Sequence, residues 1–183
     1  TFPFLVAQAF KQQKPGALRN INLGLPPSDQ AIVFIDNHDL QRLHERSSLL
    51  SFQDDPIAFR LAQVFLLTWP YGYPQIFSGF NMKNFDQGPP VDDFLITKPI
   101  LDQDLNCNNN WTCEHRLPEV PGLVRFRNST ARTFYASDWW SNGIDQIAFS
   151  RGSLGYVVIN NSKNTLAREL QTSLPQGEYC NLA

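Results

Sequence analysis

The chain has 183 residues and a hydrophobic fraction of 42%, which is enough for one large or two small domains with a buried core. Charged residues make up 17% and the formal net charge is -2, so the composition excludes a basic nucleic-acid-binding surface and a polyacidic tail. The longest apolar run, around residues 64–67, is far too short to cross a bilayer. We therefore expect neither nucleic acid nor membrane as a partner.

The first half of the chain predicts a strand, a helix and a strand. Residues 1–30 have a mixed composition typical of loops, and residues 31–35 (AIVFI) are apolar on both faces, which is typical of a buried strand. Residues 54–70 predict a helix capped by Asp55, with Pro56 in its first turn and an apolar face made of Ile57, Leu61, Val64 and Phe65.

A second buried strand is predicted at residues 71–77 (YGYPQIF), about 40 residues after the first. This spacing suits a βαβ unit with an elaborated first loop. A long polar stretch then covers residues 81–110, and we find no internal repeat. Pro118 and Pro121 predict that any helix in residues 113–128 is short or irregular.

The last part of the chain has a different residue pattern. Residues 145–161 contain two β-rich runs around a turn with Ser and Gly, which predicts a hairpin, and residues 167–182 could add further strands. We place a domain boundary near residues 128–132, which divides the chain into 1–128 and 129–183.

Polar side chains crowd the end of the first predicted strand. Asp36, Asn37, His38 and Asp39 follow it directly, and His44 comes shortly afterwards. In parallel sheets, residues just past the carboxyl end of a strand face the ligand crevice. The residue types alone fit metal ligands, an acid–base group, or ordinary loop polarity.

The chain has three cysteines, which is an odd number. Cys107 and Cys113 lie in an Asn-rich loop and can either pair or remain free, while Cys180 stands alone near the end. Sequons at Asn110, Asn128 and Asn160, together with the cysteines, favour a secreted protein. The chain begins with Thr1 and its only methionine is Met82, so we expect a processed chain or a fragment.

The segment FIDNHDLQR, residues 34–42, resembles the F-[VI]-D-N-H-D segment of the α-amylase family of glycoside hydrolases. Further stretches follow in the order and approximate spacing of animal-type α-amylases: YGYPQIFS, WTCEHR, VRFRN, WWSNGIDQIAFSRGSLGYVVINN and LQTSLPQGEYC. The resemblance covers nearly the whole chain.

The resemblance implies an α/β fold, namely the last part of a (β/α)8 barrel followed by part of an all-β domain C. Residues 31–35 and 71–77 would be barrel strands seven and eight, and domain C would start at residue 129. It also implies a Cys107–Cys113 disulfide and a partner for Cys180 beyond residue 183. The four tryptophans would belong to the scaffold rather than to sugar-stacking platforms.

The implied activity is endo-hydrolysis of α-1,4-glucosidic bonds in starch or glycogen by a retaining mechanism, performed by a secreted, monomeric full-length protein. Asp39 matches the transition-state-stabilising carboxylate, His38 and His44 match substrate-binding histidines, and Arg42 is expected to form a structural ion pair. The nucleophile and the acid/base would lie upstream of Thr1, so this chain alone is expected to be inactive.

The resemblance to the family also bears on two bound ions, calcium and chloride. The calcium ligands would lie upstream, so no metal site is expected within this chain. Asn37 matches a chloride ligand, but Gln75 stands where the family has an arginine, so we do not expect chloride binding. The alternatives are a non-catalytic starch-binding or interaction protein of the same fold, and a metal-dependent hydrolase that uses His38, Asp39 and His44.

Overall fold

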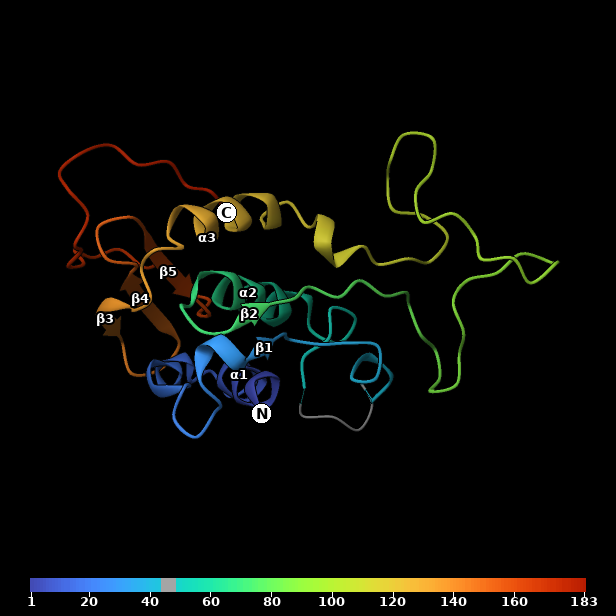
Figure 1. Ribbon diagram of the computed structural model, residues 1–183, viewed down its shortest axis with the longest axis horizontal. Coiled ribbons are helices and arrows are strands. Elements are labelled where there is room, and N and C mark those ends of the chain that lie inside the picture. Colours follow the sequence, from blue (N-terminus) through green and yellow to red (C-terminus); the bar gives the residue numbers. More distant parts are fainter. Residues whose placement is uncertain (44–48) are drawn as a thin grey trace.

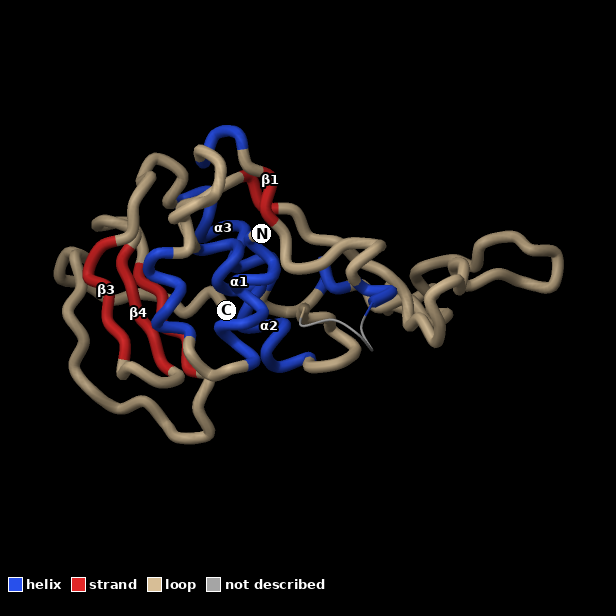
Figure 2. Tube along the Cα trace, turned by 90° about the horizontal axis from the view of Figure 1, so that it is seen from below, coloured by secondary structure: helices blue, strands red, loops and turns tan. Residues whose placement is uncertain are grey.

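The computed structural model describes residues 1–43 and 49–183. Helices α1 (Phe2–Lys11), α2 (Pro56–Thr68) and α3 (Val120–Ser129) form the middle of the molecule. A three-stranded sheet covers one end, and the loop of residues 81–112 projects from the other end (Figures 1 and 2). None of the described helices is long and apolar enough to cross a membrane.

Helix α1 corrects the prediction that residues 1–30 are loop. Phe2, Val6 and Phe10 are spaced one helical turn apart, and all three are buried in the core. Pro3 does not oppose the helix because it lies in the first turn, where a backbone N–H has no intrahelical acceptor. The spacing of these three side chains was the signal that the loop prediction overlooked.

Helix α2 begins as predicted. The side chain of Asp55 accepts a hydrogen bond from the backbone N–H of Ala58 at 2.9 Å, and Pro56 occupies the first turn. The predicted buried face was wrong at one position, since Ile57 is 71% exposed. The helix carries apolar residues on more than one side, so periodicity alone does not fix its rotation; the residues that enter the core are Ala58, Phe59, Ala62, Phe65 and Leu66.

The strand–helix–strand prediction is confirmed. Strand β1 (Ile32–Val33) pairs in parallel with β2 (Tyr73–Pro74), and α2 lies between them in sequence. The predicted burial of both faces was wrong, because Ile32 is 60% exposed while Val33 is 2% exposed. Only one face of this sheet packs on the core, and within the described residues no third strand joins it.

The second sheet is antiparallel, with the order β3 (Ser137–Ser141), β4 (Gln146–Ser150) and β5 (Tyr156–Asn160). The predicted hairpin is β4–β5, which pairs in continuous register from Gln146↔Asn160 to Ser150↔Tyr156. The further strands considered for residues 167–182 are not formed in this part of the described chain. This segment is held by isolated bonds such as that from the Ser173 N–H to Ser150 Oγ, rather than by a backbone ladder.

One hydrophobic core joins α1 and α2 to strands β4 and β5. At its centre, the rings of Trp69 and Phe149 meet edge to face at 5.3 Å, and Trp139 stacks on Phe149 at 5.8 Å. These tryptophans pack in the scaffold, as expected. The core contains residues from both predicted domains, so burial does not separate them. The boundary near residue 128 stays a prediction.

A buried arginine closes this core. Arg151 is 3% exposed and donates to the backbone oxygens of Thr68 (2.6 Å), Thr130 (3.1 Å) and Thr133 (2.5 Å). Thr68 is the last residue of α2, so the cation meets the negative end of the helix dipole. Burial, with Arg127 nearby, lowers the pKa of Arg151 to about 10, and the guanidinium therefore remains charged at neutral pH.

Helix α3 is more regular than predicted. Pro121 lies in its first turn, where proline is tolerated, and Pro118 precedes the helix. The ten-residue helix is therefore not interrupted, and its C-terminal Arg127 donates to the backbone oxygens of Trp69 and Gly72, both at 2.7 Å.

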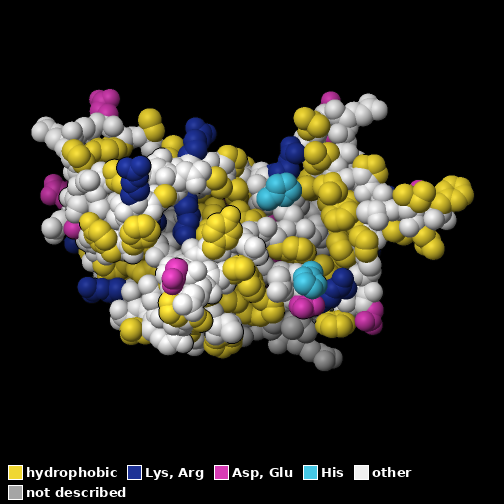
Figure 3. Space-filling model, viewed as in Figure 1, with side chains coloured by type: hydrophobic (Ala, Val, Ile, Leu, Met, Phe, Trp, Pro, Cys, Tyr) yellow, Lys and Arg dark blue, Asp and Glu magenta, His cyan; other side chains and the backbone are white. Residues whose placement is uncertain are grey.

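The projecting loop contains a short structural repeat, which corrects the sequence analysis. Asp92 and Asp102 each accept two backbone N–H groups through Oδ1, at 2.8–2.9 Å, from residues within the next four positions. Leu95 and Leu105 follow with positive φ angles of 63° and 62°. Hydrophobic side chains cover the tip of this loop (Figure 3); the exposed ones include Phe85, Phe94, Leu95, Ile96 and Leu105.

A disulfide joins Cys107 and Cys113 at the base of the projecting loop, with a Cα–Cα distance of 6.1 Å. A disulfide that closes so small a loop contributes about 2 kcal/mol of stability. Peptide mapping without reductant should recover these two cysteines as one linked peptide, which separates on reduction. Alkylation of both thiols in the non-reduced sample would contradict this pairing.

Candidate active site

The polar loop that follows β1 forms one wall of a hollow of about 590 Å³. The other wall follows β2, so the two strand ends face each other across the hollow, as expected for parallel neighbours. The lining residues are Phe34, Asp36, Asn37, His38, Tyr73, Pro74, Gln75, Ile76 and Phe77.

The side chain of Asn37 shapes this loop. Its Oδ1 accepts the backbone N–H groups of Asp39 (3.1 Å) and Leu40 (2.8 Å), and its backbone oxygen accepts the N–H of Gln41 (3.0 Å). An asparagine that bonds its own backbone two residues on is a common way to stabilise a turn. The loop is therefore a closed turn that leads into the 3-10 helix Gln41–Leu43.

The turn presents Asp39 and His38 to solvent. Their side chains are 74% and 69% exposed, and His38 Nε2 lies 3.6 Å from Asp39 Oδ1. The His38 ring also lies against Phe77, with ring centroids 6.4 Å apart. Of the pair, His38 lines the hollow and Asp39 does not. A carboxylate and an imidazole held side by side can hydrogen-bond the hydroxyls of a polar ligand.

A buried polar network lies beneath the exposed pair. The amide nitrogen of Gln41 donates to Asp36 Oδ2 at 2.7 Å and to Glu114 Oε1 at 3.0 Å. Glu114 comes from the 3-10 helix Glu114–Arg116, directly after the disulfide. The sequence analysis did not single out Gln41 or Glu114, because no local pattern links positions 73 residues apart.

Burial raises the pKa of Asp36 to about 7. The hydrogen bond from Gln41 lowers this pKa in part, and the nearby Glu114 raises it. The folded protein therefore binds more protons than the unfolded chain between pH 4 and pH 7, so stability falls as pH rises through this window.

We expect Asp36→Asn to flatten this part of the stability profile, measured by urea unfolding at pH 5 and 7.5. The exposed Asp29→Asn should keep the slope; an unchanged slope in Asp36→Asn would contradict the assignment.

Arg42 fixes the far end of the loop. Its Nη1 donates to the backbone oxygens of Phe85 and Gln87, at 2.7 and 2.9 Å. Among the described residues, Arg42 therefore binds two carbonyl groups, and the predicted ion pair stays a prediction. His44 lies outside the described residues.

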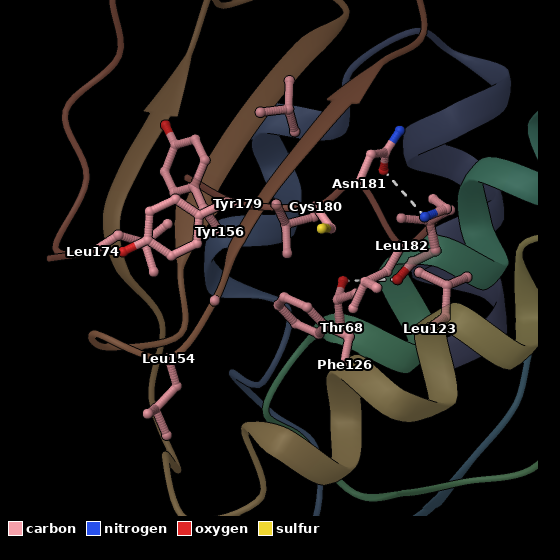
Figure 4. Close-up of a pocket in the computed structure, with 15 residues that line it drawn as sticks. Thr68, Leu123, Phe126, Leu154, Tyr156, Leu174, Tyr179, Cys180, Asn181 and Leu182 are labelled. Carbon is pink, nitrogen blue, oxygen red and sulfur yellow. Dashed lines mark hydrogen bonds between the residues drawn. The ribbon is translucent and has the colours of Figure 1, made fainter. Parts of the chain in front are cut away.

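A second hollow, of about 510 Å³, lies between α3, β5 and the chain end (Figure 4). Its described lining is mostly apolar, with Leu123, Phe126 and Leu182, and it includes no Asp, Glu, His, Lys or Arg. Gly122 allows the chain end to approach α3, because a Cβ there would lie 1.6 Å from the backbone oxygen of Leu182. Its described lining has no carboxylate or imidazole side chain, whereas the β1 loop carries both, so we place the candidate site at the β1 loop.

Comparison with known proteins indicates the family of this chain. The family described as "Alpha amylase, C-terminal all-beta domain" matches residues 139–183. The crystal structure of α-amylase I from Eisenia fetida superposes with a TM-score of 0.82 and 33% identity, over 99% of this chain and 39% of that chain. The chain belongs to the α-amylase family.

The α-amylase relatives share much of this sequence. The pancreatic α-amylase of Rattus norvegicus is 39% identical over 170 residues, and the α-amylase-related protein of Drosophila willistoni is 41% identical over 160 residues. These alignments cover 87% of this chain but 33% and 32% of the relatives, so the chain spans about a third of their length.

The residues of this α-amylase segment do not fit an anion. The described lining of the β1 hollow has no Arg or Lys, and the buried carboxyl of Asp36 lies next to Asn37. Oδ1 of Asn37 already holds the turn, and the Gln75 side chain offers an uncharged amide where the family has an arginine. For metals, the described residues contain no group of three or more His, Cys, Asp or Glu side chains that could hold an ion.

Proposed function

We propose that this chain is the carboxyl-terminal part of a secreted α-amylase that hydrolyses α-1,4-glucosidic bonds in starch or glycogen with retention. The observation that carries the proposal is the exposed Asp39–His38 pair on a turn anchored at both ends. The Eisenia fetida enzyme supports the substrate class, because a variant of it that covers 99% of this chain was crystallised with maltohexaose.

In this proposal, β1 and β2 are strands seven and eight of a (β/α)8 barrel, and residues 129–183 begin domain C. Asp39 hydrogen-bonds hydroxyls of the sugar whose bond is cleaved. These bonds strengthen as the oxocarbenium-like transition state forms, so the carboxylate lowers the barrier. His38 contacts the same sugar, and His44 is a proposed further contact. The preceding part of the protein supplies the nucleophile, the acid/base and the calcium ligands.

The test uses the full-length protein and the 183-residue chain side by side. The full-length protein should release reducing sugar from starch, and NMR should show the α-anomer as the first product. The chain alone should release none, because a retaining mechanism needs two further carboxylates. Binding of starch without cleavage by the full-length protein would instead favour the non-catalytic binding protein.

Chloride should not be required for this activity. An anion in the β1 hollow would lose its hydration without a cation among the described lining residues to compensate. After dialysis into chloride-free buffer, the full-length enzyme should keep its activity on starch, and Gln75→Arg should create a response to added chloride. Activation of the wild-type enzyme several-fold by chloride would contradict the prediction.

Secretion would permit both the disulfide and glycosylation at the three sequons. The sequons differ in access: Asn128 is exposed on α3, whereas the amide of Asn160 is half-buried and donates to the backbone oxygen of Asn164 at 2.8 Å. Asn110 is exposed, but its amide donates to the backbone oxygen of Asn81 at 2.9 Å. Asn128 is therefore the glycan site that we propose first.

A further inference from the structure

Gln41 joins two separate segments of the site through one side chain, and Glu114 extends the connection to a third. It is 2% exposed, and its amide bridges Asp36 at the end of β1 to Glu114 beside the disulfide. The second oxygen of Glu114 accepts the hydroxyl of Thr112 at 2.7 Å and the N–H of Gly79 at 3.2 Å. The β1 loop is thus fastened both to the chain that follows β2 and to the disulfide loop.

The hydrogen bonds from Gln41 to Asp36 and Glu114, here called the Gln41 bridge, hold the turn that carries Asp39. Asp36 anchors the start of this turn and Gln41 anchors its end, and the Gln41 N–H closes it onto the Asn37 oxygen at 3.0 Å. Within the part of the chain that the structure describes, the carboxylate of Asp39 is largely exposed and its one close side-chain contact is His38 Nε2 at 3.6 Å. Its position therefore depends on the backbone of the turn rather than on contacts of its own.

The surroundings of the Gln41 side chain leave little space and leave two buried oxygens without hydrogen-bond partners. A Cβ at Gly79 would lie 2.1 Å from Gln41 Oε1, so glycine is needed there for the bridge to fit. Within the described residues, Gln41 Oε1 and Asp36 Oδ1 are buried without hydrogen-bond partners. Each such atom costs about 1–3 kcal/mol, and unfavourable arrangements of this kind concentrate at functional sites.

We propose that Gln41 is a positioning residue, which holds the Asp39 carboxylate in register with the sugar by clamping the turn to Glu114. The inference rests on the proposed function, because it requires Asp39 to act on the substrate. A displacement of about 1 Å at a catalytic group can lower the rate by up to about 100-fold, so loss of the clamp should appear in kcat.

The first variant is Gln41→Met in the full-length enzyme, which keeps the side-chain length and removes the amide. We expect kcat on a chromogenic maltooligosaccharide to fall about tenfold or more, with KM changed less than about twofold. Gln63→Met is the matched control, because Gln63 is 1% exposed on α2 and its amide has no partner among the described residues. The control should keep the wild-type kcat.

A double-mutant cycle separates positioning from a general loss of structure. If Gln41 acts through Asp39, adding Gln41→Met to Asp39→Asn should lower kcat by less than about twofold further. A full additional tenfold loss would overturn the inference while leaving Asp39 in its proposed role. If Asp39→Asn alone leaves kcat unchanged, the proposed function itself has failed.

Thr112→Val provides the same test if Gln41→Met does not fold. It removes one hydroxyl donor to Glu114 and keeps the shape of the side chain, so it should loosen the clamp mildly. We expect a kcat decrease of about threefold that disappears in the Asp39→Asn background. No decrease, or an equal decrease in both backgrounds, would overturn the inference.

Discussion

Asp39→Asn in the full-length enzyme should lower kcat by roughly 100-fold or more, with little change in KM. The substitution keeps the size of the side chain and removes its charge, and removal of one preorganised stabilising group costs about this much. The fold should tolerate the change, because the Asp39 side chain is 74% exposed and holds no buried partner among the described residues. Steady-state kinetics on a maltooligosaccharide would measure it.

The control for this substitution is Asp29→Asn. Asp29 is also exposed, but it precedes β1 at the opposite end of the strand from the site. We expect wild-type kinetics from this variant. An Asp39→Asn enzyme with the same kcat as Asp29→Asn would show that Asp39 is an ordinary loop residue.

Arg151→Met should cause the largest loss of stability, about 3–5 kcal/mol in the free energy of unfolding. The substitution fills similar space but leaves the backbone oxygens of Thr68, Thr130 and Thr133 without their donor in the buried interior. Because these oxygens end α2 and follow α3, the contact between the helices and the β4–β5 hairpin should weaken. Urea unfolding of the full-length protein, followed by circular dichroism, would measure the change.

Arg132→Met is the matched control for Arg151→Met. Arg132 is exposed and lies two residues from Thr130 in sequence, so its substitution should change stability by less than about 0.5 kcal/mol. Equal stability of the two variants would contradict the assignment of Arg151 as a structural clamp.

Local signals predicted the βαβ unit well. Asp55 and Pro56 mark the start of α2 because an N-cap and a first-turn proline act within one turn of the chain. The β4–β5 hairpin was equally accessible, since its strands and turn are contiguous. Of the polar residues expected at the end of β1, Asp36, Asn37 and His38 line a hollow, whereas Asp39 does not.

Features that depend on distant contacts were not predictable in this way. Ile57 and Ile32 are apolar and yet exposed, because tertiary packing, and not composition, decides which face is covered. The Gln41–Glu114 bond joins segments whose proximity only the fold creates. The repeat at Asp92 and Asp102 lies mainly in backbone geometry, because the side chains between the two aspartates differ.

The most direct test of the account is a crystal structure of the full-length enzyme with a non-hydrolysable maltooligosaccharide analogue. We expect an Asp39 carboxylate oxygen within about 3.2 Å of hydroxyls on the sugar at the cleavage point, with His38 contacting the same sugar. Gln41 should still bridge Asp36 and Glu114 beneath them, as it does here. An oligosaccharide bound away from the β1 loop, with Asp39 facing only solvent, would contradict the account.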